Sequence, residues 1–212
     1  MNHITYTAIG DSLTEGIGAS FSAGFVQRYD QMTETTLNVP VNTNKFARKG
    51  LTSNELLKIL KNEYVRRGIE QANIITITIG GNDLLQAYRA YSKSNDNRFL
   101  RNSLHLLYGN FKNIVADINA IKSNSPVCSY FIRIIGLYNP YPHLPYSDYW
   151  VQQVNHILDS FTSSSVKIVH IYPTFQQHGK KLLSFGGIHP NENGYHVIAE
   201  QLAKSGYFPL NV

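Results

Sequence analysis

The sequence predicts an α/β protein of three layers, α/β/α, with a flavodoxin-like five-stranded parallel sheet in the strand order 2-1-3-4-5. Three observations lead to this prediction. Five short runs rich in Val, Ile, Tyr, Phe and Thr recur along the 212 residues, and such residues favour strands. Amphipathic helical patterns separate the runs, and this alternation is typical of a parallel sheet covered on both faces. No internal repeat or linker interrupts it, so we expect a single domain over residues 1–212.

The five predicted strands are all short and rich in β-branched and aromatic residues. They are Ile4–Ile9, Val39–Phe46, Ile74–Ile79, Val127–Ile135 and Val166–Tyr172. For five parallel strands of this kind the order 2-1-3-4-5 is our leading expectation.

Three helical patterns lie between and after the strands. The first opens with a capping box, Thr52-Ser53-Asn54-Glu55, and its expected apolar face consists of Leu56, Leu57, Leu60 and Tyr64. The second is a long amphipathic helix whose apolar residues alternate spacings of four and three, namely Leu100, Leu104, Leu107, Phe111, Ile114, Ile118 and Ile121. The third begins at Pro190-Asn191, and its apolar stripe consists of Tyr195, Ile198, Ala199 and Leu202.

Composition and charge exclude several classes of protein. The chain is 42% hydrophobic and 16% charged, as ordinary globular proteins are. Its net charge of +5 is spread over short basic pairs, so we expect solvated surface and no nucleic-acid partner; weak attraction to anionic lipid or a polyanionic substrate is the alternative. The single cysteine, Cys128, cannot form an intrachain disulfide, and its apolar neighbours predict that it is buried.

The start of the chain and its hydropathy bear on its location. Met1 precedes the first predicted strand by only a few residues, and no apolar run approaches the roughly 20 residues that span a bilayer. We therefore expect no stable membrane insertion and, for the chain as written, a cytoplasmic protein. Removal of a leader from a longer precursor would instead imply a secreted or membrane-anchored protein.

Polar, glycine-containing loops follow the first three predicted strands. They are Gly10-Asp11-Ser12, Arg48-Lys49-Gly50 and Gly80-Gly81-Asn82-Asp83. In the predicted order the first strand lies between the second and third, and ligands bind beyond the carboxyl ends of the strands at this switch point. We therefore expect Ser12, Gly50 and Asn82 to lie near one another.

These residue types suit acyl transfer, which needs a nucleophile, a base and donors aimed at the developing oxyanion. Ser12 can supply a hydroxyl and its backbone N–H. Gly50 can supply a second N–H because it has no Cβ, and Asn82 can supply a neutral amide donor. Among the eight histidines, His189 is the candidate base, since Pro190 biases it away from helical conformation and holds it in a defined loop.

Together these blocks resemble the SGNH, or GDSL, hydrolase family. The matching positions are Gly10-Asp11-Ser12-Leu13-Thr14, Gly50, Gly80-Gly81-Asn82-Asp83 and His189-Pro190, in order across almost the whole chain. The stretch from Gly136 to Tyr141, GLYNPY, further resembles the bacterial lipase/acylhydrolase branch. The resemblance implies a serine esterase or thioesterase without metal or cofactor, in which Ser12 is the nucleophile and His189 the base. It also implies an oxyanion hole formed by Ser12, Gly50 and Asn82.

One position departs from the family pattern. The family has an aspartate three residues before the histidine, and this chain has Gly186 there. Three explanations are open. The Gly187 carbonyl could accept the His189 Nδ1–H and give a Ser–His dyad, Glu192 could replace the aspartate, or the activity could be weak or lost.

Other interpretations of the same residues account for less. Asp11, Ser12, Asn82 and Asp83 could simply cap helices, but capping does not explain why the loops converge. A metallophosphoesterase needs a denser set of His and Asp ligands than this chain has. Nucleotide binding through Gly16–Ser20 is also disfavoured, because the third glycine and the lysine of a phosphate loop are absent. The non-enzyme alternative is a degenerate hydrolase that binds an acyl or glycan ligand without hydrolysing it. This alternative stays open because Gly186 stands where the family has an aspartate.

The substrate is expected to be a small-molecule or lipid ester. Apolar residues beside the candidate loops could line an acyl pocket, namely Leu13, Phe21, Phe25, Leu84, Leu85, Tyr88 and Tyr91. For Phe25 and Leu85 we favour ordinary core packing. The loop Tyr138–Tyr146 is predicted to form a rim or lid over the leaving group, with Tyr138 among the substrate-binding residues.

Overall fold

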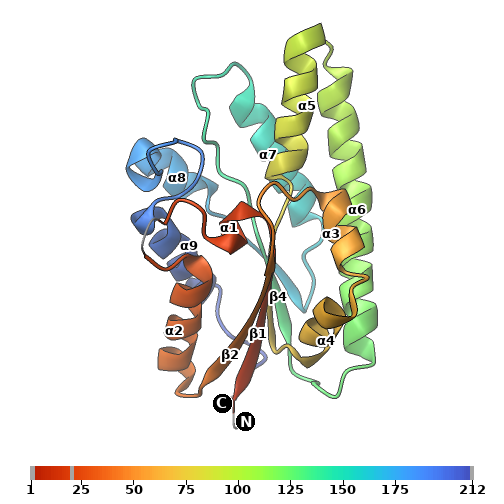
Figure 1. The fold of residues 1–212 in the computed structure, drawn as a ribbon, viewed down its shortest axis with the longest axis vertical. Helices are drawn as coiled ribbons and strands as arrows, with labels where there is room; N and C mark the ends of the chain where they lie inside the picture. The colour runs from red at the N-terminus through yellow and green to blue at the C-terminus, as the bar shows by residue number, and fades with distance from the viewer. Residues whose placement is uncertain (1–2, 20–21, 211–212) are drawn as a thin grey trace.

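The computed structural model describes residues 3–19 and 22–210, and its centre is a five-stranded parallel sheet (Figure 1). The strands are β1 (Ile4–Gly10), β2 (Val41–Ala47), β3 (Ile74–Thr78), β4 (Phe131–Ile135) and β5 (Val166–Val169). Their order is β2-β1-β3-β4-β5, and every neighbouring pair is parallel. The predicted fold class and strand order are therefore confirmed.

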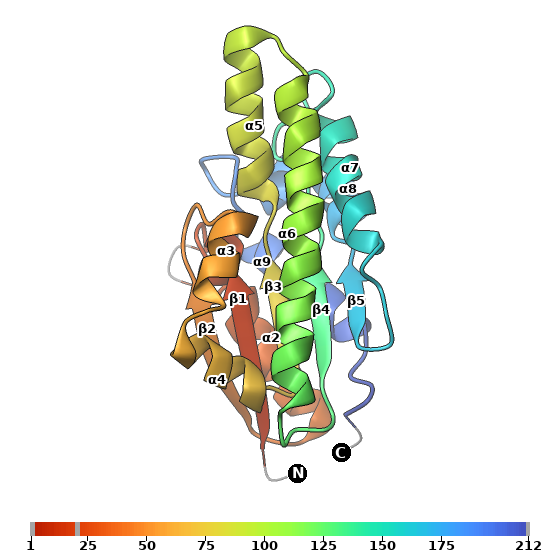
Figure 2. The same ribbon diagram turned by 90° about the vertical axis from the view of Figure 1, so that its right-hand side faces the viewer.

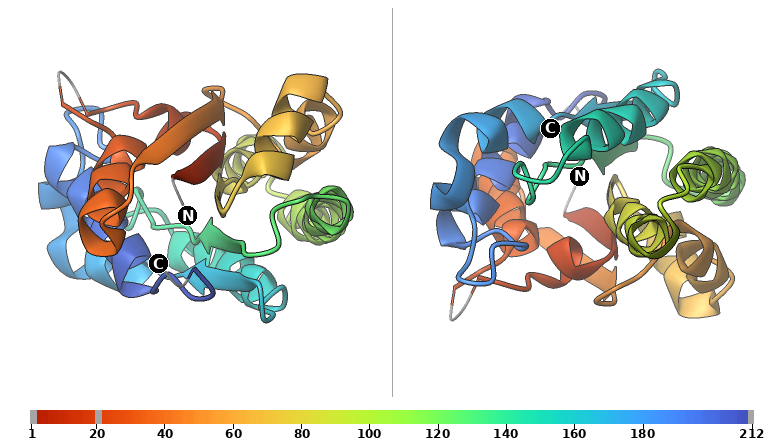
Figure 3. Two further views of the ribbon diagram at one scale, coloured as in Figure 1. Left: turned by 90° about the horizontal axis from the view of Figure 1, so that it is seen from below. Right: turned by 90° about the horizontal axis from the view of Figure 1, so that it is seen from above.

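Helices cover both faces of the sheet, as the views along the strands show (Figure 3). One layer contains α2 (Phe25–Leu37), α8 (Tyr172–His178) and α9 (Glu192–Lys204), with the short α1 (Ser12–Glu15) and a 3-10 turn at Gly179–Leu182 beside it. The other layer contains α3 (Ser53–Ile59), α4 (Glu63–Gln71), α5 (Gly81–Ser94), α6 (Arg98–Ser123) and α7 (Ser147–Asp159).

Alternate residues of the strands pack into two apolar cores, one on each face. Ile75 and Ile77 of β3 pack with residues of α3, α4, α6 and α7, whereas the preceding Ile74 packs on the α2 and α9 side. All five residues of β3 are buried, as expected for a central strand covered on both faces. The two cores fix the sheet rigidly beneath the loops at its carboxyl edge.

Helix α6 and helix α9 match their predicted patterns. The apolar stripe of α6 is buried at Leu100, Leu107, Phe111, Ile114, Ile118 and Ile121, and that of α9 at Tyr195, Ile198, Ala199 and Leu202. With α5, α6 forms a helical hairpin that projects beyond the carboxyl edge of the sheet (Figure 2). Within the described ranges no helix has both the length and the hydropathy needed to cross a membrane.

The predicted helix after Thr52 is divided in two. Its capping box is present, since Thr52 Oγ1 accepts from the Glu55 N–H and the Glu55 carboxylate accepts from the Thr52 N–H. However, α3 ends at Ile59, and Asn62 caps a second helix by accepting from the Tyr64 N–H at 2.9 Å. Tyr64 therefore lies in the first turn of α4 and is 77% exposed, so its predicted place on the apolar face was wrong.

The strands β4 and β5 are several residues shorter than predicted, for identifiable reasons. β4 begins at Phe131 rather than Val127, because it pairs from Ile74, where β3 itself begins. Cys128 lies in the unpaired segment before β4 and is exposed, so the prediction that it is buried was wrong. β5 ends at Val169, and Tyr172, predicted as the end of this strand, instead begins α8 with a proline beside it.

Candidate active site

Ser12 lies at a sharp turn where β1 ends. A side chain at Gly10 would place its Cβ within 2.4 Å of Thr78 atoms on β3, so only glycine permits this close approach. Asp11 caps α1: its carboxylate accepts from the Leu13 N–H at 3.0 Å and from Thr78 Oγ1 at 2.9 Å. Ser12 is then the first residue of α1, almost buried at the carboxyl edge of the sheet.

His189 faces Ser12 from the segment that precedes α9. Its Nε2 lies 3.0 Å from Ser12 Oγ, within hydrogen-bonding distance. The segment is held by bonds from the Ser184 N–H to the His189 carbonyl and from the Asn191 N–H to the Leu182 carbonyl. Burial, and secondarily the positive charge of Lys49, lower the pKa of His189 below its usual 6.5. The imidazole is therefore neutral at pH 7, as a general base must be.

The other ring nitrogen of His189 lacks the predicted acceptor. Among the described residues only Ser12 hydrogen-bonds to this imidazole, so the predicted bond to the Gly187 carbonyl is not formed. Gly187 instead adopts a left-handed conformation (φ +68°) in a turn closed by its own N–H and the Ser184 carbonyl. Glu192, the predicted substitute acid, is exposed and pairs with Arg28 at 3.1 Å. Ser12 and His189 thus form a pair without a carboxylate.

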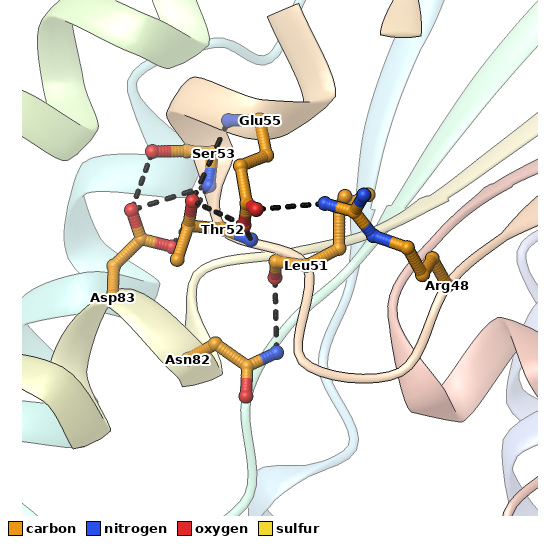
Figure 4. Close-up of polar contacts among 7 residues, drawn as sticks. All are labelled: Arg48, Leu51, Thr52, Ser53, Glu55, Asn82 and Asp83. Atoms are coloured by element: carbon orange, nitrogen blue, oxygen red, sulfur yellow. Dashed lines mark hydrogen bonds and ion pairs between the residues drawn. The ribbon is translucent and has the colours of Figure 1, made fainter. Parts of the chain in front are cut away.

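Gly50 and Asn82 complete the predicted set. Gly50 has φ +80° in the exposed loop after β2, and a Cβ there would meet no atom within 4 Å. Asn82 is the second residue of α5, and its Nδ2 donates one hydrogen to the Leu51 carbonyl at 2.9 Å (Figure 4). The second Nδ2 hydrogen bonds to none of the described residues. Ser12, Gly50, Asn82 and His189 all line one cavity.

The cavity has a volume of about 870 Å³ and extends from Ser12 along α5 and α7. All four predicted substrate-binding residues, Leu13, Leu84, Tyr88 and Tyr138, line it. Tyr91 and much of the predicted loop Tyr138–Tyr146 do so as well. Leu85 also lines the cavity, so its assignment to core packing was wrong. Phe25 is fully buried in the core as favoured, and Phe21 lies outside the described residues.

Sequence reasoning missed part of the cavity wall. Additional apolar lining comes from Leu100, Leu137, Val151 and Trp150. Tyr138 does more than line the cavity, since its hydroxyl donates to the Ile188 carbonyl and its ring stacks on Phe175 at 4.4 Å. This tyrosine therefore joins the loop after β4 to the segment that carries His189. In the described ranges, no three His, Cys, Asp or Glu side chains gather as metal ligands.

A model of the GDSL-like lipase/acylhydrolase family matches residues 8–197. The chain belongs to this family. It is 37% identical over 207 residues to the spore germination lipase LipC of Bacillus licheniformis, and the match covers 96% of this chain and 97% of the relative. The chain is thus a GDSL-type lipase/esterase, and the resemblance inferred from the sequence is confirmed.

Solved structures agree with this assignment. The crystal structure of the lipase Lip_vut3 from a goat rumen metagenome superposes with a TM-score of 0.93 at 35% identity, over 98% of this chain and 100% of that one. A catalytic mutant of Axe2, an acetylxylan esterase from Geobacillus stearothermophilus, has a TM-score of 0.73 over 98% of this chain and 97% of its own. At 13% identity, that second likeness shows the shared fold alone.

Proposed function

We propose that the chain hydrolyses carboxylic esters through an acyl-enzyme on Ser12, with His189 as the general base. The observation that carries the proposal is the 3.0 Å distance between Ser12 Oγ and His189 Nε2. A hydroxyl at its ordinary pKa is a weak nucleophile, and a neutral imidazole in hydrogen-bond reach activates it.

The reaction proceeds in two balanced halves. His189 Nε2 takes the Ser12 proton while Oγ attacks the ester carbonyl, and the resulting tetrahedral intermediate expels the alcohol, which receives that proton from Nε2. Water then replaces the alcohol: His189 Nε2 takes a proton from the water as its oxygen attacks the acyl carbon. The second tetrahedral intermediate expels Ser12 Oγ, which receives that proton from Nε2, so the carboxylic acid leaves and Ser12 and neutral His189 are restored.

Three donors are proposed to stabilise the tetrahedral oxyanion. They are the backbone N–H groups of Ser12 and Gly50 and the second Nδ2 hydrogen of Asn82. The bond from Asn82 to the Leu51 carbonyl supports this role, because it orients the amide before substrate binds. Donors held in place in advance need no reorganisation when charge develops.

The imidazolium formed during each half has no carboxylate beside it. Burial and Lys49 both disfavour its charge. This observation favours a slow enzyme over one with a full triad, and it is what supports the second candidate, a degenerate hydrolase that binds its ligand without turning it over.

We propose that the part of the ester bound along α5 is an apolar acyl group, and the lining of the cavity supports this placement. His189 must reach the leaving oxygen, so the alcohol lies on the α9 side of Ser12. Leu84, Leu85 and Tyr88 follow Asn82 along α5, which belongs to the opposite layer. The acyl chain therefore extends from the oxyanion donors along α5, and a cavity of about 870 Å³ has room for more than an acetyl group.

Two experiments test the proposal. Hydrolysis of p-nitrophenyl esters from acetyl to palmitoyl, with and without EDTA, should show metal-independent turnover that improves beyond acetyl. A fluorophosphonate should label Ser12, detected by mass spectrometry of its peptide, and should not label Ser12→Ala. Labelling without turnover would favour the degenerate hydrolase, whereas absence of both would refute the assignment of Ser12.

A further inference from the structure

The carboxylate of Asp83 reaches across from α5 to the first residue of α3. Oδ1 accepts from Ser53 Oγ at 2.6 Å, and Oδ2 accepts from the Ser53 N–H at 3.0 Å (Figure 4). Helix capping by Asp83, considered from the sequence, is thus real, but the helix it caps is the neighbouring one. We refer to these two bonds as the Asp83–Ser53 clamp.

The clamp lies directly beside the proposed oxyanion donors. Asp83 follows Asn82, and Ser53 lies three residues after Gly50. The Asn82–Leu51 bond runs alongside it, so the loop after β2 and the start of α5 are joined by adjacent side-chain contacts. Moving either segment relative to the other would therefore break both connections.

The sheet itself does not hold these two segments together. In the order β2-β1-β3, strand β1 lies between the strands that lead to Gly50 and Asn82, so no ladder of hydrogen bonds joins β2 to β3. The distance between the two donors consequently depends on contacts beyond the strand ends. The Asp83–Ser53 clamp and the Asn82–Leu51 bond are such contacts.

Helix α3 has a capping box of its own, formed by Thr52 and Glu55, and Asp83 adds only the acceptor for the Ser53 N–H. Burial raises the pKa of Asp83 above its ordinary value, so the carboxylate is kept in a place that disfavours its charge. Helix α6 supports it further: Asn110 Nδ2 donates to Ser53 Oγ at 2.8 Å and Ser103 Oγ donates to the Asp83 carbonyl at 3.2 Å.

We infer that Asp83 is a positioning residue of the oxyanion hole, whose bonds to Ser53 hold the Gly50 N–H and the Asn82 amide in one fixed arrangement. The inference rests on the proposed function, because it assigns Asp83 a role only through those two donors. It predicts that loss of the clamp weakens transition-state stabilisation while ground-state binding of substrate is retained.

The test compares kcat and KM of Asp83→Ala, Asp83→Asn and Ser53→Ala on p-nitrophenyl butyrate. We expect kcat to fall about 10- to 100-fold in Asp83→Ala, less in the other two, with KM within about threefold of wild type. The matched control is Asn62→Ala, which removes the cap of α4 away from the cavity. It should lower thermal stability without changing kcat.

A double-mutant cycle separates positioning from a general structural role. In the Asn82→Ala background, Asp83→Ala should reduce kcat by less than it does alone, because part of its target has been removed. Equal losses in the two backgrounds, or wild-type kcat in folded Asp83→Ala, would overturn the inference. A wild-type kcat in Asn82→Ala would instead refute the oxyanion hole itself, so the two failures are distinguishable.

Discussion

Replacing Gly186 with aspartate should increase turnover by giving His189 the carboxylate that the family pattern contains. The backbone permits the change: Gly186 lies outside the left-handed region, is exposed, and a Cβ there would meet no atom within 4 Å. The left-handed residue of this turn is Gly187, which stays unchanged. Gly186→Asp therefore adds charge near His189 without backbone strain.

The expected increase in turnover depends on how exposed to solvent the Gly186→Asp carboxylate and the His189 imidazolium are. Two unit charges about 4 Å apart attract by about 4 kcal/mol at an effective dielectric constant of 20, and by about 1 kcal/mol in water. His189 is half-buried and Gly186 is exposed, so we expect about 1–2 kcal/mol of stabilisation of the imidazolium. This corresponds to a kcat increase of about 5- to 30-fold.

The assay is steady-state hydrolysis of p-nitrophenyl butyrate between pH 5 and 9 for wild type, Gly186→Asp and Gly186→Asn. The asparagine variant has the same shape without the charge and so controls for loss of glycine. A carboxylate also raises the pKa of His189, so the acid limb of kcat/KM should move to higher pH in the aspartate variant alone. Identical kcat and pH profiles for the two variants would refute the reasoning.

Three further predictions concern neighbouring residues. Asn82→Ala should lower kcat about 10²–10³-fold with KM nearly unchanged, measured by steady-state kinetics; wild-type kcat would make Asn82 a turn residue only. Lys49→Gln should raise the pKa of His189, because Lys49 helps to lower it, so the acid limb of kcat/KM at low salt should move to higher pH; an unmoved limb would contradict this. Burial raises the pKa of Asp11 to about 6, above the usual 3.8 of the unfolded chain, so its contribution to stability is present below pH 4 and lost as pH rises to 6. Denaturant unfolding should therefore show Asp11→Asn gaining stability relative to wild type across that window, by about 3 kcal/mol; a pH-independent difference would contradict the raised pKa.

The sequence predicts the sheet and the catalytic edge because both depend on local patterns. β-branched runs mark the strands, and a parallel order brings the loops after β1, β2 and β3 to one edge. Ser12, Gly50 and Asn82 follow those strands directly, so strand order alone brings them together. His189 could be found because the following proline and α9 restrict its backbone.

The errors come from contacts that a single sequence does not encode locally. Cys128 has apolar neighbours, but β3 begins too late to pair with its segment. Aspartate is a common capping residue, so the sequence suggests that Asp83 caps a helix. Which helix it caps depends on the packing of α3 against α5 and α6. The bond expected at the Gly187 carbonyl fails because the turn geometry, not the residue type, decides where a carbonyl points.

Helix α5, which forms one wall of the cavity, is less buried than the elements around it. Of its 14 residues only Ala87 is buried, whereas α6 buries a full apolar stripe. Local opening free energy follows buried contacts, so native-state amide exchange should be fast in the outer turns of α5 and slow in β1 and β3. The wall that we propose for the acyl chain is therefore less protected from local opening than the strands that lead to Ser12 and Asn82. If the proposed function holds, substitutions along the outer turns of α5 should change which acyl chain lengths are accepted and leave the cleavage of the ester bond unaffected.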